Sequence, residues 1–153
     1  MIGSLLLLVL FGTITFGLIF NRYQGLQSAA REGARVGALQ ATSRTDIINR
    51  VRESVSVIQA SAISSGTCDP TALALDQGCV RIFAKQMPTA TCPSTSCIEV
   101  LNGNPSQTPC GPTYSGPDKS VLVKVYYRTR IDIPLWASPQ MTMAGGAEFK
   151  CEN

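Results

Sequence analysis

Residues 1–20 read MIGSLLLLVLFGTITFGLIF and run without a break into residues 21–40, NRYQGLQSAAREGARVGALQ. No charged side chain lies between Ile2 and Phe20, and no turn signal separates the two stretches. At about 1.5 Å rise per residue, this apolar part of a helix covers roughly 28 Å, close to the roughly 30 Å hydrocarbon core of a bilayer. We therefore predict one helix that continues to about Ala41 and begins as a membrane anchor.

Two other interpretations of residues 1–20 are weaker. A cleavable secretory signal has a basic start, a shorter apolar core and a small-residue cleavage site. Here nothing basic precedes Ile2, and the helical pattern continues past Phe20. A buried core helix would require the remaining chain to wrap a segment that is apolar on all sides. The pattern favours a transmembrane or filament-core helix.

Composition argues against several classes of function. The chain has 153 residues, enough for one small domain beside the anchor, with 15% charged residues and a net charge of +3. It contains no histidine, which removes the commonest general base and the commonest zinc ligand. Paired carboxylates, a glycine-rich phosphate loop and a run of basic residues are also missing. We therefore expect no enzyme, no cofactor and no nucleic-acid partner.

Six cysteines follow the helical region, and we expect them to form disulfides in an oxidising compartment. They are Cys68, Cys79, Cys92, Cys97, Cys110 and Cys151. Intervals of ten and four intervening residues do not match the Cys-x-x-Cys spacing of a metal site. Fifteen pairings are possible. Cys92–Cys97 would pin a tight turn, Cys68–Cys79 would close a loop between helix and sheet, and Cys110–Cys151 would tie a long loop to the C-terminal strand.

The cysteines also bear on orientation. The positive-inside rule applied to Arg22 would place the residues after the anchor in the cytoplasm. Six reduced thiols without ligands would be hard to explain there, so we give the cysteines more weight and expect export of the head.

Small residues form two ridges on the second half of the predicted helix. Ala29, Gly33 and Gly37 step by four residues, and so do Ala30, Ala34 and Ala38. Such ridges let helix backbones approach closely. They could pack subunits together, or they could seat the next helix or the sheet of the same chain. The residues predicted to form the assembly helix are Leu5, Leu8, Phe11, Gly12, Phe16, Gly17, Ala30, Gly33, Ala34, Gly37 and Ala38.

The rest of the chain predicts a small α+β head. Ser43 or Thr45 can cap a second, amphipathic helix that runs to about Ser61. Strands are expected at 80–84, 98–101, 121–128 and within 140–151, forming a small antiparallel sheet of three or four strands. The sheet would pack on the second helix and on the distal part of the first. This divides the chain into an N-terminal helix (1–42), a second helix (43–66) and a cysteine-rich β head (67–153).

Two motifs in the long helix resemble a known family. Phe11-Gly12-Thr13-Ile14-Thr15-Phe16-Gly17 and the later Ala29-Ala30-Arg31-Glu32-Gly33-Ala34-Arg35-Val36-Gly37-Ala38 are similar to the TadE/TadG-like pilin proteins of tight-adherence (Tad, Flp-type) pilus systems. Residues 119–150 are also similar to the C-terminal half of that family. The cysteine-rich middle has no counterpart.

The resemblance implies a pilin-like subunit, held in the bacterial inner membrane as a precursor and placed in a surface pilus after assembly. Its partners would be further copies of itself, in a helical homopolymer formed through the N-terminal helix, and other pilus assembly proteins. The alternative is a membrane-anchored minor pilin or accessory protein that does not itself form the fibre. The loop from Asn102 to Ser120, with Tyr114 and Lys119, is a candidate adhesive surface, although long Gly/Pro loops usually are exposed connectors.

Overall fold

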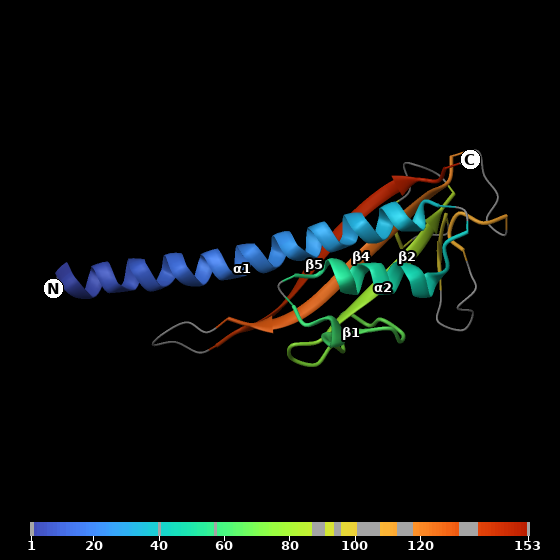
Figure 1. Ribbon diagram of the computed structural model, residues 1–153. Coiled ribbons are helices and arrows are strands. Elements are labelled where there is room, and N and C mark those ends of the chain that lie inside the picture. Colours follow the sequence, from blue (N-terminus) through green and yellow to red (C-terminus); the bar gives the residue numbers. More distant parts are fainter. Residues whose placement is uncertain are drawn as a thin grey trace.

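A small α+β head is carried at one end of a long helix, α1 (Ile2–Gly37) (Figure 1). The computed structural model describes residues 2–39, 41–56, 58–86, 91–93, 96–100, 108–112, 118–131 and 138–152. The N-terminal half of α1 projects away from the head, and its C-terminal half packs against a second helix and a sheet. The predicted α+β architecture is therefore confirmed.

The α1 helix ends at Gly37, about one turn earlier than the predicted end at Ala41. The Leu39 amide donates to the carbonyl of Val36, three residues back, and this tighter bond closes the last turn. The chain then reverses direction and enters α2 (Arg44–Ser54).

Ser43 caps the N-terminus of α2, as the sequence predicted. Its hydroxyl oxygen accepts from the amide of Asp46, and the Asp46 carboxylate accepts from the Ser43 amide at 3.1 Å. These reciprocal bonds form a capping box. Hydrogen bonding from Ser43 holds the pKa of Asp46 below its usual value.

We expect Ser43→Ala to lower the free energy of unfolding by about 1 kcal/mol, because an amide of the first turn loses its acceptor. The measurement is urea unfolding of the full chain in detergent micelles, with Thr45→Ala as the control in the same turn. Because the pKa of Asp46 is lower in the folded protein, its carboxylate stabilises the cap at any pH above the usual pKa of an aspartate. This contribution is lost as the pH falls through the pKa of the folded protein. The difference between wild type and Ser43→Ala should therefore shrink below about pH 4. Equal stability at pH 7 would contradict the assignment of the cap.

The end of α2 at Ser54, rather than near Ser61, corrects the predicted length of this helix. Val55 is already extended, and only a short 3₁₀ turn, η1 (Ala60–Ala62), follows. The apolar residues that suggested a longer helix, Val55 and Ile58, are still buried, but from non-helical backbone. Alternating serine and β-branched residues disfavour helix here.

Among the residues that the structure describes, the sheet has five strands rather than the three or four expected. They are β1 (Ile63–Ser64), β2 (Gly78–Lys85), β3 (Cys97–Glu99), β4 (Ser120–Arg130) and β5 (Gln140–Lys150). The order is β1-β2-β4-β5, and β3 also pairs with β2. β2, β3, β4 and β5 pair antiparallel, as predicted, but β1 runs parallel to β2. The sheet is therefore mixed. Residues 65–77 form the long connection that a parallel pair requires.

One face of the sheet forms the core with the two helices. On β4, Val121, Val123 and Val125 are fully buried, whereas Leu122, Lys124, Tyr126 and Arg128 are only half-buried. The valines pack in one cluster with Leu26, Ala30 and Ala34 of α1 and with Ile47, Ile48 and Val51 of α2. β4 lies between β2 and β5, so it is an inner strand of the sheet.

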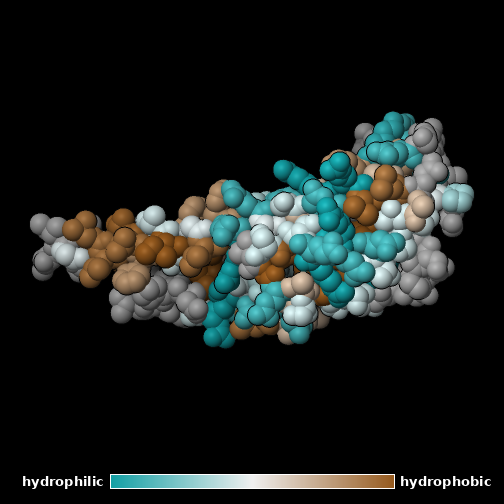
Figure 2. All heavy atoms as spheres, viewed as in Figure 1, coloured by the Kyte–Doolittle hydropathy of each residue, from teal (hydrophilic) through white to brown (hydrophobic). Residues whose placement is uncertain are grey.

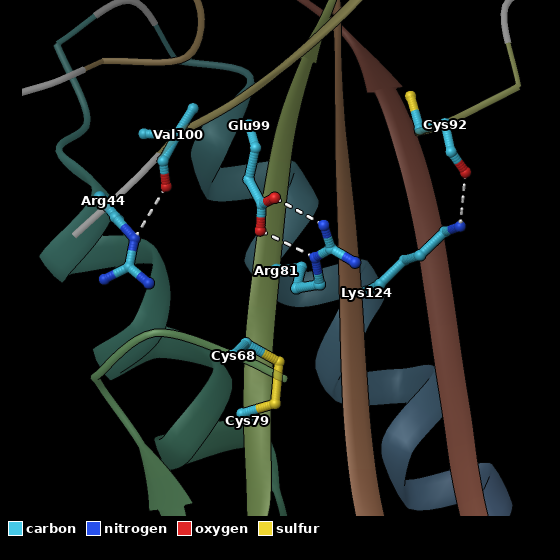
Figure 3. Close-up of polar contacts among 8 residues, drawn as sticks. All are labelled: Arg44, Cys68, Cys79, Arg81, Cys92, Glu99, Val100 and Lys124. Carbon is cyan, nitrogen blue, oxygen red and sulfur yellow. Dashed lines mark hydrogen bonds and ion pairs between the residues drawn. A yellow bond between two sulfur atoms is a disulfide. The ribbon is translucent and has the colours of Figure 1, made fainter. Parts of the chain in front are cut away.

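Three disulfides close the head in the pairing considered from the sequence. They join Cys68 to Cys79, Cys92 to Cys97 and Cys110 to Cys151, at 11, 5 and 41 residues of separation. Figure 3 shows the first of them, which ties the chain after β1 to the start of β2.

We expect removal of Cys110–Cys151 to destabilise the head more than removal of Cys92–Cys97. In the chain-entropy account, the longer closed loop contributes about 4 kcal/mol and the shorter about 2 kcal/mol. Both cysteines of one bridge are replaced by serine in the full chain, one bridge at a time. Pulse proteolysis in urea then measures how much each double substitution lowers the free energy of unfolding. The shorter bridge serves as the control, and an equal or reversed order would contradict this expectation.

Candidate assembly and membrane helix

The first half of α1 exposes apolar side chains all around the helix, and we call residues 2–20 the stem. Leu6, Leu8 and Phe16 are 63%, 67% and 70% exposed. The other strongly exposed members are Leu7, Val9, Leu10, Phe11, Ile14, Leu18 and Phe20. In Figure 2 the stem is brown, and it gives way to hydrophilic side chains where it meets the head. Such a surface needs a covering of lipid or protein.

The stem has the length and composition to cross a bilayer. Within the described residues, one helical segment, Leu6–Gly37, is long and apolar enough to span the hydrocarbon core. None of its most apolar stretch is buried by the rest of the chain. The anchor is thus supported by length, composition and exposure together, whereas the core helix of a soluble protein would be mostly buried.

Polar groups of the stem are compatible with an apolar environment. The Thr13 hydroxyl donates to the carbonyl of Val9 at 2.8 Å, so it is satisfied within the helix. Gly12 and Gly17 have no contact that explains them, because a Cβ built on either would meet nothing within 4 Å. Glycine costs about 1 kcal/mol relative to alanine inside a helix. A neighbouring helix that approaches at these positions would account for that cost.

The small residues of the second half of α1 lie in the core of the head. Ala30, Ala34 and Ala38 are at most 4% exposed, and Gly33 and Gly37 are buried as well. A Cβ on Gly33 would collide with Val51 of α2, and one on Gly37 would lie 3.0 Å from Ile47. The sequence left two roles open for these small residues. In the structure they pack against the second helix and the sheet of the same chain. A role of these residues between subunits stays a prediction.

The sheet contributes one docking residue that the sequence did not single out. A Cβ on Gly145 of β5 would lie 2.6 Å from the backbone carbonyl of Leu26, so the α1 backbone rests directly on this glycine. A glycine pair inside a strand pattern is the signal that could have predicted close backbone approach.

Three basic side chains of the head bind a carboxylate or a backbone carbonyl of the same chain. Arg81 forms two hydrogen bonds with Glu99, at 2.8 and 2.6 Å, Arg44 donates to the carbonyl of Val100 at 3.0 Å, and Lys124 donates to that of Cys92 at 3.2 Å (Figure 3). Burial lowers the pKa of the Arg44 guanidinium, and hydrogen bonding with Glu99 raises that of Arg81.

The hydroxyl of Tyr127 donates to the carboxylate of Asp76 at 3.3 Å. Burial, helped by the charge of Asp76, raises the pKa of Tyr127. Among the residues that the structure describes, no group of three His, Cys, Asp or Glu side chains could hold a metal ion. These contacts therefore serve the fold of the head.

Part of the predicted surface lies outside the described residues. This applies to Tyr114 and to most of the Asn102–Ser120 loop. Leu5 belongs to the stem by its place in α1.

A scan against protein families identifies the segment that contains the stem. Residues 1–35 match the family model described as TadE-like protein. The chain carries a TadE-like N-terminal segment. The match covers Phe11–Gly17 and Ala29–Arg35 and confirms the resemblance there; the similarity proposed for residues 119–150 lies outside it. A TadE-like segment supports a protein associated with the Tad pilus, in a family that is structural or accessory. Curated proteins and solved structures gave no significant match.

Proposed function

We propose that this chain is a structural pilin-like subunit of a Tad/Flp-type pilus that assembles into a helical filament through the stem of α1. The observation that carries the proposal is a 36-residue helix whose first half is apolar and exposed, while its second half is fixed in the head. This arrangement supports a role in which other molecules cover the stem, while the head folds without them.

If the chain assembles in this way, its stem lies first in the membrane and then in the fibre. In the inner membrane, lipid tails cover Leu6, Leu8 and Phe16. Helices gain little hydrophobic energy from one another in lipid, so close packing at Gly12 and Gly17 would promote their association. In a fibre outside the membrane, burial of the stems contributes about 25 cal/mol per Å² of apolar surface. A repeated contact between two different surfaces of the subunit produces an open filament.

The second candidate is a membrane-anchored minor pilin or accessory protein. One observation favours it, since Ala30, Gly33, Ala34, Gly37 and Ala38 are already used inside the head and leave the stem as the main surface for assembly. In either case the head faces the outside of the inner membrane, and the partners are other pilus proteins.

Immunogold electron microscopy of sheared surface material separates the two candidates. Antibody against the head should label fibres along their whole length if the chain forms the filament. Label only at fibre tips, or only in membranes, would contradict the fibre-forming role and support the accessory one. Cells that lack the chain provide the control for antibody specificity.

A further inference from the structure

Strand β5 runs alongside α1 in the same direction, and two contacts fix how these elements are aligned (Figure 1). The backbone of Leu26 lies against Gly145. Further on, the amide of Glu152 donates to the carbonyl of Ala38 at 3.0 Å. Between these two contacts the extended chain covers about 23 Å and the helix about 18 Å. Met141 precedes Gly145 by about 13 Å on β5, which corresponds to about 10 Å along α1 towards its N-terminus, and it is therefore level with the last turn of the stem.

A contact of the neighbouring strand gives the same level independently. Nη1 of Arg22 donates to Oγ1 of Thr129 at 2.6 Å, and Thr129 pairs with Met141 across the two strands. Arg22 is the first charged residue after the stem, and long helical side chains lie over the preceding turn, so this contact lies towards the stem. Ile19 of the stem is also partly buried against the core cluster of the head. The end of β4 and the start of β5 therefore lie beside the last turn of the stem.

The end of β4 and the start of β5 form one surface, which we call the strand ends, residues 129–131 and 139–141. Met141 is 37% exposed, and Arg130 and Gln140, which pair across the two strands, are exposed as well. The amide of Ile131 donates to the carbonyl of Pro139 at 2.9 Å, so the two chains stay paired beyond the strands. Arg130 forms no ion pair with any residue that the structure describes. An exposed apolar side chain beside a long cation suits the boundary between acyl chains and headgroups, because the charged end of arginine reaches the phosphates.

The stem sets where a membrane lies relative to the strand ends. A bilayer has a hydrocarbon core of about 30 Å and a polar layer of roughly 5–8 Å on each side. The stem covers roughly 28 Å, so its last residue, Phe20, marks the boundary between the core and the polar layer on the side of the head. Thr129 and Met141 are held at that boundary by the contacts of Arg22 and Gly145 with the rest of the chain. With the stem in a bilayer, the strand ends therefore lie in the polar layer and displace lipid headgroups.

We propose that the strand ends form a second membrane contact, which embeds Met141 beside the stem in the leaflet on the side of the head. The proposal rests on the proposed function, because it requires the stem to be in a bilayer. Met141 contacts acyl chains, Arg130 binds lipid phosphates, and the hydrogen bond from Arg22 to Thr129 joins this contact to the stem. The two contacts together fix the depth of the anchor and the orientation of the head on the membrane.

Photo-crosslinking of the full chain in phospholipid vesicles tests the proposal. A diazirine amino acid is introduced at position 141, and lipid adducts are measured by mass spectrometry after irradiation. Position 149 is the matched control, because Phe149 lies on the same face of β5 and is 40% exposed, against 37% for Met141. It lies about 26 Å further along the strand, outside the polar layer. We expect about tenfold more lipid adducts from position 141 than from position 149, because only position 141 reaches the bilayer.

Two results from position 141 would overturn the proposal. These are a yield of lipid adducts equal to that of position 149, and adducts formed mainly with other copies of the chain. Position 8 in the stem, where Leu8 is 67% exposed, distinguishes a failure of the proposed function. A chain without lipid adducts from position 8 contradicts the membrane anchor itself. Lipid adducts from position 8 without lipid adducts from position 141 contradict this inference alone.

Discussion

Phe11→Asp is expected to abolish surface fibres and to reduce membrane retention of the chain, while the head still folds and forms its disulfides. Phe11 lies halfway along the uncharged stretch from Ile2 to Phe20, and its side chain is 48% exposed. An aspartate near the middle of a membrane span costs roughly 2.5–3.5 kcal/mol on insertion scales. In a fibre it would place an unpaired charge among packed stems. The readouts are fibre yield after shearing and the membrane-bound fraction.

Leu39→Asp is the matched control for this substitution. Leu39 is also an exposed apolar residue, at 45%, but it lies on the head after the end of α1. The same change of chemistry there should leave membrane retention and fibre yield close to wild type. Normal fibres from Phe11→Asp, or an equal loss in both variants, would contradict the assembly role of the stem.

Gly145→Ala is expected to lower the free energy of unfolding by about 2–3 kcal/mol, a typical cost of overpacking. The new methyl group would lie 2.6 Å from backbone atoms of Leu26, and backbone cannot move aside as a flexible side chain can. α1 would have to shift away from β5, and the buried Leu26 and Ala30 would lose contacts. Urea unfolding of the full chain in detergent micelles measures the loss.

The neighbouring glycine, Gly146, provides a control in which the same substitution should not lower the free energy of unfolding. A Cβ on Gly146 would lie 3.7 Å from the side chain of Lys124, an ordinary contact. Gly146→Ala should therefore be neutral or slightly stabilising, because alanine loses less backbone entropy than glycine in a strand. Similar effects of the two substitutions would mean that α1 does not rest on Gly145.

The sequence was sufficient to predict features that depend on local pattern. The uncharged apolar run of residues 2–20 predicts the stem, and Ser43, one of the two capping residues considered, marks the start of the second helix. The family resemblance came from the same segment, and the match over residues 1–35 confirms it.

Features that depend on contacts between distant segments were harder to predict from the sequence. Val55 and Ile58 have helical spacing, yet they are buried from non-helical backbone because α2 ends at Ser54. The parallel pairing of β1 depends on where residues 65–77 return the chain. Small residues such as Gly33 signal close approach, but only the fold identifies Val51 as the neighbour. Whether α1 also contacts other copies depends on molecules outside this chain.

Photo-crosslinking from the stem tests the central claim most directly. A benzophenone amino acid at position 16, where Phe16 is 70% exposed, is introduced into the full chain, and sheared surface material is irradiated. We expect adducts between copies of this chain in the fibre fraction. Position 39 on the head, where Leu39 is 45% exposed, should give far fewer. Fibres without chain-to-chain adducts from position 16, or adducts confined to lipid in the membrane fraction, would contradict assembly through the stem.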